Sequence, residues 1–331
     1  MRESGMGDGR ALLVTAIVAV MTMIGTGSGK AADHGRKLPP LAEAKMAYID
    51  FRYSPFPYRG IIPDKEIPFL DVVDGIRRGH TSPRNQTVYW EDQTYSDRHA
   101  LIYFPAGFDI AKPAVILVFF HGNGATLSRD VVARQQVPQQ LAQSGLNAVL
   151  IAPQFALDAI DSSAGNFWTP GVFSHFLEEA AGKMAKVYGA DDTRAVFARL
   201  PVVILAYSGG YNPAAYAVDV GGANWRIRGV LLLDALYAEE DKFAHWLARY
   251  RKSVFFFSAY TKSAADSNTT LEGMLSYQRI KFTTAEPTRL QAGNICFFAT
   301  DPELVHDDLV THAWVDDPVR WLLERVSGYR R

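Results

Sequence analysis

The sequence has a single cysteine, Cys296, so an intrachain disulfide is excluded and a large core must stabilise the fold. Cys296 lies in the apolar run 295–299, where a thiol usually packs as an inert core residue rather than acting as a reactive group. Hydrophobic residues make up 48% of the 331 residues, which is enough apolar material for one large core.

The sequence also lacks a strong charge bias, with a formal net charge of −1 and no long run of like charge. Nucleic acid and an anionic membrane are therefore not expected as partners. No glycine-rich phosphate loop follows the first strand of an alternating unit, so we expect no nucleotide cofactor. No His-Glu-x-x-His or paired-cysteine motif is present, and we expect no metal, although His306, Asp307, Asp308 and His312 are close in sequence.

The amino-terminal residues have the order of features typical of a secretory signal peptide. Arg2 and Arg10 precede the apolar run 11–24, and small residues follow it up to a plausible cleavage point near Ala31. The run is too short to span a bilayer comfortably, although an uncleaved anchor is the alternative. We expect residues 1–31 to be a signal peptide, and the mature chain to be secreted or periplasmic with no stable membrane span.

The remaining chain divides by composition near residue 85. Residues 32–85 are rich in Pro, Tyr, Phe and Arg without a clear helical or strand period. We predict an extended segment that wraps the main body, the alternative being that it borders the functional site. Residues 86–331 are predicted to form the main domain.

Apolar runs that predict strands alternate with helical patterns in this domain. The strands are expected at 87–90, 100–104, 114–120, 147–152, 202–205, 227–233, 254–258 and 295–299. The helices are expected at 127–143, 171–188, 243–250 and 269–279, and from 318 to about 328. Pro138 should break the first of these helices. Thr269 and Glu272 have the spacing of a capping box at the start of the fourth. The pattern predicts an α/β fold with a mostly parallel, doubly wound central sheet of about eight strands. Functional groups should gather at the carboxyl ends of these strands.

One strand end has the pattern of a nucleophile elbow, a tight turn from a strand to a helix with an exposed serine. The apolar run 202–205 stops at Ala206-Tyr207-Ser208-Gly209-Gly210. The turn requires small residues two positions before and after the serine, which Ala206 and Gly210 provide. A glycine-rich turn with an incidental serine is the alternative interpretation.

Other polar residues also follow predicted strands. His121-Gly122-Asn123-Gly124 follows 114–120, Asp234 follows 227–233, and His306 follows the last strand. With these motifs, residues from about 85 to the end resemble the α/β-hydrolases, in which Ser, Asp and His occur in this order. The resemblance implies a serine hydrolase in which Ser208 is the nucleophile.

The chemistry of such a site requires a base, an acid and oxyanion donors. For the base we favour His306, in the loop directly after the last strand, over His312. For the acid we favour Asp234, at the end of an apolar strand, over Asp266.

The expected oxyanion donors are the backbone amides of Gly209 and Asn123. Gly124 is the alternative to Asn123, and His121 is expected to be structural. The loop 154–169 is a candidate for shaping the pocket through Phe167, Trp168, Asp158 or Asp161, the alternative being an ordered loop without such a role.

We therefore expect a serine hydrolase without a cofactor. Its expected reaction is cleavage of a small-molecule carboxylic ester through an acyl-serine intermediate. An amidase or peptidase, an acyltransferase and a catalytically silent binding protein on the same fold are the alternatives.

Overall fold

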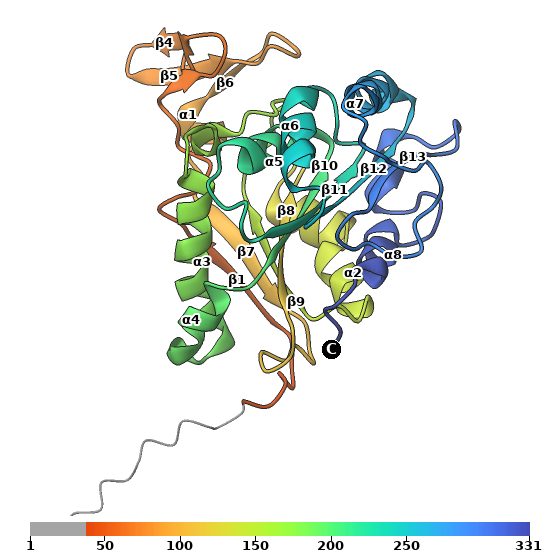
Figure 1. Ribbon diagram of the computed structural model, residues 1–331. Helices are drawn as coiled ribbons and strands as arrows, with labels where there is room; N and C mark the ends of the chain where they lie inside the picture. Colours follow the sequence, from red (N-terminus) through yellow and green to blue (C-terminus); the bar gives the residue numbers. More distant parts are fainter. Residues whose placement is uncertain (1–37) are drawn as a thin grey trace, which may run out of the picture. The chain divides into compact units, whose positions relative to one another are not determined.

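The computed structural model describes residues 38–331, so the predicted signal peptide at 1–31 lies outside the described residues. In this part of the chain, an eight-stranded sheet runs through the centre in the order β1-β7-β9-β8-β10-β11-β12-β13 (Figure 1). The strands are β1 (Lys45–Asp50), β7 (His99–Phe104), β8 (Val115–Phe120), β9 (Ala148–Pro153), β10 (Val202–Tyr207), β11 (Ile227–Leu233), β12 (Phe255–Tyr260) and β13 (Ile295–Ala299).

The direction of the strands confirms the predicted fold class. β7 is antiparallel to both of its neighbours, β1 and β9, and every other pair in the sheet is parallel. This order and these directions are those of the α/β-hydrolase fold, which the resemblance of the sequence implied.

The central strands are buried on both faces because their sequences are apolar throughout. All six residues of β8 are buried. Successive side chains of a strand point to opposite faces, so Ile116 and Val118 pack in one core and Leu117 and Phe119 in the other.

Helices cover both faces of the sheet (Figure 1). The first core includes residues of α3 (Val172–Tyr188), α4 (Arg194–Phe197), α5 (Tyr211–Asp219), α6 (Glu240–Tyr250) and α7 (Ala265–Tyr277). The second includes residues of α2 (Val137–Gln143), α8 (Pro318–Arg325) and the π-helix η1 (Leu127–Arg134). The remaining helices are α1 (Glu91–Thr94) and the 3-10 turns η2 (Gly165–Trp168), η3 (Asp191–Thr193), η4 (Ser208–Gly210), η5 (Lys262–Ala264) and η6 (His306–Val310).

Two helix predictions meet different outcomes. The predicted helix 127–143 is divided just before Pro138, with Gln136 in a left-handed conformation and Pro138 in the first turn of α2. The capping box at Thr269 is wrong, because α7 already begins at Ala265 and Thr269 lies inside it. Ala264, which precedes the helix, occupies its N-cap position.

The amino-terminal segment contains more regular structure than its sequence pattern predicts. β1 is an edge strand of the central sheet, and its alternation is hidden because two of its three exposed residues, Met46 and Tyr48, are hydrophobic. β2 (Ile61–Ile62) and β3 (Ile67–Pro68) form a two-stranded sheet, and β4 (Val72–Asp74), β5 (Arg77–Thr81) and β6 (Val88–Trp90) form a three-stranded sheet. The segment and the rest of the described chain belong to one compact unit, Leu38–Arg331.

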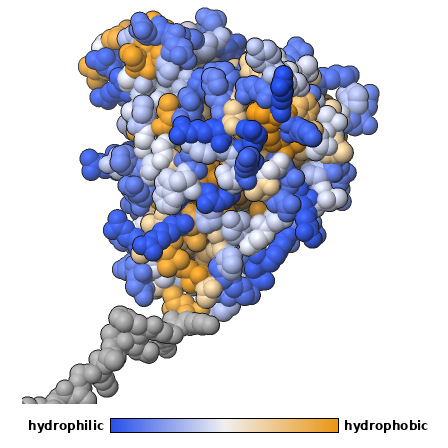
Figure 2. All heavy atoms as spheres, in the orientation of Figure 1, coloured by the Kyte–Doolittle hydropathy of each residue, from blue (hydrophilic) through white to orange (hydrophobic). Residues whose placement is uncertain are grey.

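Apolar side chains are also exposed around the three-stranded sheet. Figure 2 shows a hydrophobic area over β4 and β5, where Val73 and Ile76 are exposed. The predicted strand 87–90 belongs to this sheet as β6 and does not join the central one.

Between residues 38 and 331 there is no helix with both the length and the apolar character needed to cross a membrane.

Candidate active site

Ser208 lies in a sharp turn between β10 and α5, with a backbone φ of 53°. A positive φ is unusual for a residue other than glycine and stores strain on the order of 1–3 kcal/mol. The turn brings neighbouring backbone so close that a Cβ atom on Gly210 would clash with the Phe120 carbonyl oxygen. A Cβ on Gly122 would lie 2.7 Å from Ser208 Cβ. The small residue predicted at position 210 is thus a steric requirement.

His306 connects Ser208 to Asp234. Its Nε2 lies 2.7 Å from Ser208 Oγ, and its Nδ1 lies 2.6 Å from Asp234 Oδ2. The imidazole ring also stacks on Tyr207, with ring centroids 4.9 Å apart. The structure therefore brings together the serine, the favoured histidine and the favoured acid in one hydrogen-bonded chain.

Asp234 is fully buried and accepts several hydrogen bonds. Its carboxylate accepts from Thr261 N at 2.8 Å, Thr261 Oγ1 at 2.9 Å and Ser263 Oγ at 2.8 Å, in addition to His306. Burial alone would raise the pKa of Asp234, but the hydrogen bonds from His306, Thr261 and Ser263 outweigh it and keep the pKa below its usual value. The carboxylate is therefore ionised and oriented at neutral pH.

The two alternative residues lie elsewhere. The side chain of His312 is 73% exposed, and its Nε2 lies 3.5 Å from Asp308. Asp266 is exposed in the first turn of α7, where a carboxylate interacts favourably with the helix amino terminus. Neither makes a hydrogen bond to the Ser208–His306–Asp234 chain within the described residues.

The turn after β8 presents a backbone amide beside the serine. Gly124 N–H donates to Ala159 O at 2.7 Å, whereas the Asn123 N–H has no acceptor within residues 38–331. Gly209 lies in the first turn after β10, where amides have no partner within the helix. The side chain of Asn123 packs directly against Gly209, since a Cβ on Gly209 would collide with it.

The side-chain amide of Asn123 has hydrogen-bond partners on both its nitrogen and its oxygen when the nitrogen faces Asp161. Its nitrogen then donates to Asp161 O at 2.8 Å and Ser162 Oγ at 3.0 Å, and its oxygen accepts from Arg84 Nη1 at 3.3 Å. The turn is thereby tied to the loop 154–169 and to the amino-terminal segment.

His121 is a buried structural residue of the same turn. Its Nδ1 donates to Gly122 O at 2.8 Å, and its Nε2 accepts from Phe155 N at 2.9 Å. Burial lowers the pKa of His121 to about 4, so the ring is neutral at neutral pH. Both ring nitrogens are engaged, which leaves none for Ser208.

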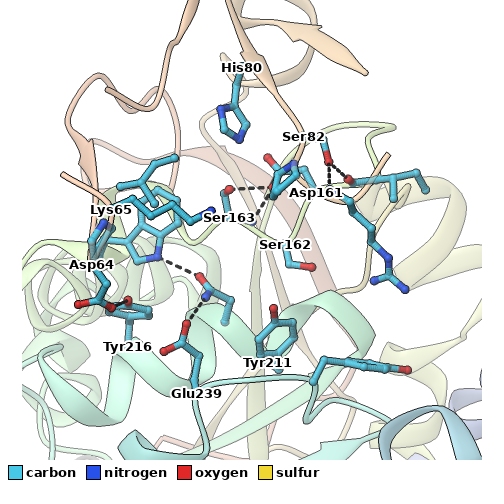
Figure 3. A pocket seen from close by; sticks show the side chains of 18 residues that line it. Asp64, Lys65, His80, Ser82, Asp161, Ser162, Ser163, Tyr211, Tyr216 and Glu239 are labelled. Atoms are coloured by element: carbon cyan, nitrogen blue, oxygen red, sulfur yellow. Dashed lines mark hydrogen bonds between the residues drawn. The ribbon is translucent and has the colours of Figure 1, made fainter. Parts of the chain in front are cut away.

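A pocket of about 440 Å³ adjoins this cluster (Figure 3). Tyr237 lines it and places its hydroxyl 3.2 Å from His306 Nδ1. Figure 3 shows Ser162 and Ser163 on the side of the pocket opposite Tyr211 and Glu239. Ser208 and His306 do not line the pocket themselves, and Tyr237 connects the pocket to the histidine.

The amino-terminal segment forms part of this pocket, so the prediction that it only wraps the body is wrong. Residues 62–65 and residues 80 and 82–84 line the pocket. They reach it because the two small sheets fold the segment back over the carboxyl ends of the central strands. A sequence without clear periodicity gives no sign of this path.

The loop 154–169 also shapes the pocket, through residues 160–163 and Trp168. Asp161 and Trp168 are the two predicted residues that line it. Phe167 is fully buried in the core, and Asp158 forms an ion pair with Arg129 at 2.7 Å. Both of these lie outside the pocket.

The sequence interpretation missed several residues around the cluster, namely Arg84, Tyr207, Tyr237, Thr261 and Ser263. For Thr261 and Ser263 a signal was present, because they directly follow an apolar strand in the way that Asp234 does. Tyr237 shares this signal, since it follows Asp234 by three residues, whereas Arg84 has none, because only the tertiary fold brings it into the pocket.

No metal site is found within the described residues. No group of three or more His, Cys, Asp or Glu side chains between residues 38 and 331 has an arrangement that could hold an ion. In the cluster His306–His312, Asp307 instead accepts a hydrogen bond from Tyr207 OH at 3.0 Å. Cys296 is buried, and burial raises the pKa of its thiol to about 12.

Comparison with known proteins gives structural similarities at low sequence identity. A feruloyl esterase module from Clostridium thermocellum is 13% identical, with a TM-score of 0.45 over 85% of this chain and 99% of that one. An S-formylglutathione hydrolase from Agrobacterium tumefaciens is 12% identical, with a TM-score of 0.42 over 77% of this chain and 97% of that one. Esterase 2 of Thermogutta terrifontis is 12% identical, with a TM-score of 0.39 over 67% of this chain and 83% of that one.

No family model and no curated protein sequence matches the chain. Because a fold hosts many chemistries, function has to be inferred from the side chains of the site.

Proposed function

We propose that this protein is a serine hydrolase that cleaves carboxylic esters through an acyl-serine intermediate. Ser208 is the nucleophile, His306 the general base and Asp234 the acid that orients the histidine. One observation carries the proposal: His306 bridges Ser208 Oγ and the buried Asp234 carboxylate, with contacts of 2.7 and 2.6 Å.

In the first half of the reaction, Ser208 Oγ attacks the carbonyl carbon of the ester and its proton passes to His306 Nε2. Asp234 holds the Nδ1–H and stabilises the imidazolium that forms. The tetrahedral intermediate then collapses, the carbon–oxygen bond to the alcohol breaks, and Nε2 returns the proton to the departing oxygen.

In the second half, water attacks the acyl-serine carbonyl and gives its proton to His306 Nε2. Collapse of the second tetrahedral intermediate breaks the bond to Ser208 Oγ, which recovers the proton. The products are a carboxylic acid, an alcohol and the free enzyme, and no cofactor takes part.

Both tetrahedral intermediates carry an oxyanion, for which we propose the backbone amides of Gly209 and Asn123 as donors. The free N–H of Asn123 and the engaged N–H of Gly124 support this choice. Loss of one such donor typically raises the barrier by about 3–4 kcal/mol.

Replacement of the nucleophile tests the proposal. We expect Ser208→Ala to lower kcat for short p-nitrophenyl esters by at least about a thousandfold, because oxyanion stabilisation and binding alone remain. The measurement is the initial rate with each purified protein, together with circular dichroism to verify folding. A folded Ser208→Ala protein with full activity would rule out the serine mechanism.

An amide substrate or transfer to an alcohol would use the same groups, and a panel of esters, amides and acceptor alcohols separates these reactions. A catalytically silent scaffold is disfavoured, because the contacts among Ser208, His306 and Asp234 are those that catalysis requires.

We also propose that the mature chain works outside the cytoplasm, as the pattern of residues 1–31 supports.

A further inference from the structure

Arg84 reaches the pocket from the amino-terminal segment and lies close to the proposed catalytic groups. Its guanidinium carbon is 5.8 Å from the ring centroid of Tyr237, and the Tyr237 hydroxyl is 3.2 Å from His306 Nδ1. On its other side, Arg84 Nη1 donates to the side-chain oxygen of Asn123 at 3.3 Å when that amide has the orientation in which its nitrogen faces Asp161. The cation is thus one side chain away from both the base and a proposed oxyanion donor.

The carboxylates that line the pocket are engaged by protein groups. Asp161 accepts from Tyr95 OH at 2.8 Å and Ser163 Oγ at 2.7 Å, Glu239 pairs with Lys242 at 2.5 Å, and Asp64 accepts from Tyr216 OH at 3.3 Å. Arg84 differs, since no carboxylate of residues 38–331 lies within 4.0 Å of its guanidinium. Arg84 is therefore a cation of the pocket that has no ionic partner among the described residues.

A guanidinium binds a carboxylate through two parallel charge-assisted hydrogen bonds, which a solvated ammonium cannot reproduce. A phosphate is a poorer match here, because a dianion would meet stronger repulsion from Asp64, Asp161 and Glu239. The aromatic side chains of Trp168 and Tyr211 line the pocket and suit the apolar part of a substrate.

Building on the proposed ester hydrolysis, we propose that Arg84 selects substrates that place a carboxylate in this pocket, such as half-esters of dicarboxylic acids. Arg84 is then a specificity-determining residue. It contacts the substrate carboxylate and takes no part in proton transfer.

The first test compares charged and neutral esters. The substrates are the mono-p-nitrophenyl esters of succinic, glutaric and adipic acid, with p-nitrophenyl butyrate as the neutral reference. We expect the ratio of kcat/KM for the best half-ester over butyrate to fall about tenfold in Arg84→Gln, chiefly through KM, because a charge-assisted hydrogen bond is lost. Arg84→Lys should keep an intermediate ratio.

The matched control is Arg78→Gln, which removes an exposed arginine of β5 outside the pocket and should leave the ratio unchanged. An equal loss for charged and neutral esters in Arg84→Gln would mean that Arg84 acts only through Asn123, and would overturn the proposal. So would an unchanged ratio for all three half-esters. In both cases, Ser208-dependent hydrolysis of butyrate would leave the proposed function intact.

A binding measurement is independent of turnover. Ser208→Ala should bind monobenzyl glutarate more tightly than the uncharged benzyl ethyl diester by isothermal titration, and Arg84→Gln in the same background should remove the difference. Equal affinities for the two compounds in Ser208→Ala would contradict the role of Arg84 even if the protein proved not to hydrolyse esters.

Discussion

Ser208 and Asp234 both have left-handed backbone, with φ values of 53° and 42°. Each directly follows a buried strand, and in each case the turn aims a polar side chain at His306. Strain of this kind persists only where the surrounding structure holds it in place. The packed strands β10 and β11 provide that support, since every residue of β10 and six of the seven residues of β11 are buried.

His121 gives the structure a predictable response to acid. Burial lowers its pKa to about 4, below the value near 6.5 of an unfolded histidine. Between these two pH values the unfolded chain binds more protons than the folded protein. The contribution of neutral His121 to the free energy of unfolding is therefore complete above about pH 6.5 and is lost as the pH falls toward 4. The two values imply a loss on the order of 3 kcal/mol in the free energy of unfolding.

The measurement is urea unfolding at several pH values between 4 and 7. We expect His121→Asn to have a shallower dependence on pH than the wild type, whatever its absolute stability. His245→Asn, at an exposed position of α6, is the control and should keep the wild-type slope. Parallel slopes for His121→Asn and the wild type would contradict the buried neutral state.

At the scale of elements, the nucleophile elbow depends on close approach between β10 and the end of β8. We expect Gly210→Ala to destabilise the protein by about 1–3 kcal/mol, because the added methyl meets the Phe120 carbonyl oxygen. Gly273→Ala is the matched control: a Cβ there meets no atom within 4 Å, and alanine favours a helix by about 0.5–1 kcal/mol.

Chemical denaturation of both variants provides the comparison. Destabilisation by Gly210→Ala and neutral or increased stability of Gly273→Ala would support the steric account of the elbow. Equal effects of the two substitutions would contradict it.

The strands that could be predicted from sequence are those that are buried on both faces, because burial on both faces gives a continuous apolar run. Strands 227–233 and 295–299 match β11 and β13, because their apolar runs end where the chain leaves the sheet. β1 was missed because an edge strand exposes one face, here that of Met46 and Tyr48. The capping motif at Thr269 does not locate the start of α7, because the helix already begins at Ala265.

At the scale of the whole molecule, the site joins residues that are far apart in sequence. His306 lies 98 residues from Ser208 and 72 from Asp234. These three could be selected from sequence because each follows a predicted strand, and the carboxyl ends of parallel strands lie at one edge of a sheet. Arg84 and the other amino-terminal residues of the pocket could not, because their position depends on how an irregular segment folds back.

The central claim is that Ser208 and His306 act together as nucleophile and base. It is tested most directly by a fluorophosphonate probe followed by peptide mapping, applied to the wild type, Ser208→Ala, His306→Ala and His312→Ala. We predict an adduct on Ser208 in the wild type and in His312→Ala, and none in Ser208→Ala or His306→Ala. An adduct on another residue, or undiminished labelling of His306→Ala, would contradict the account.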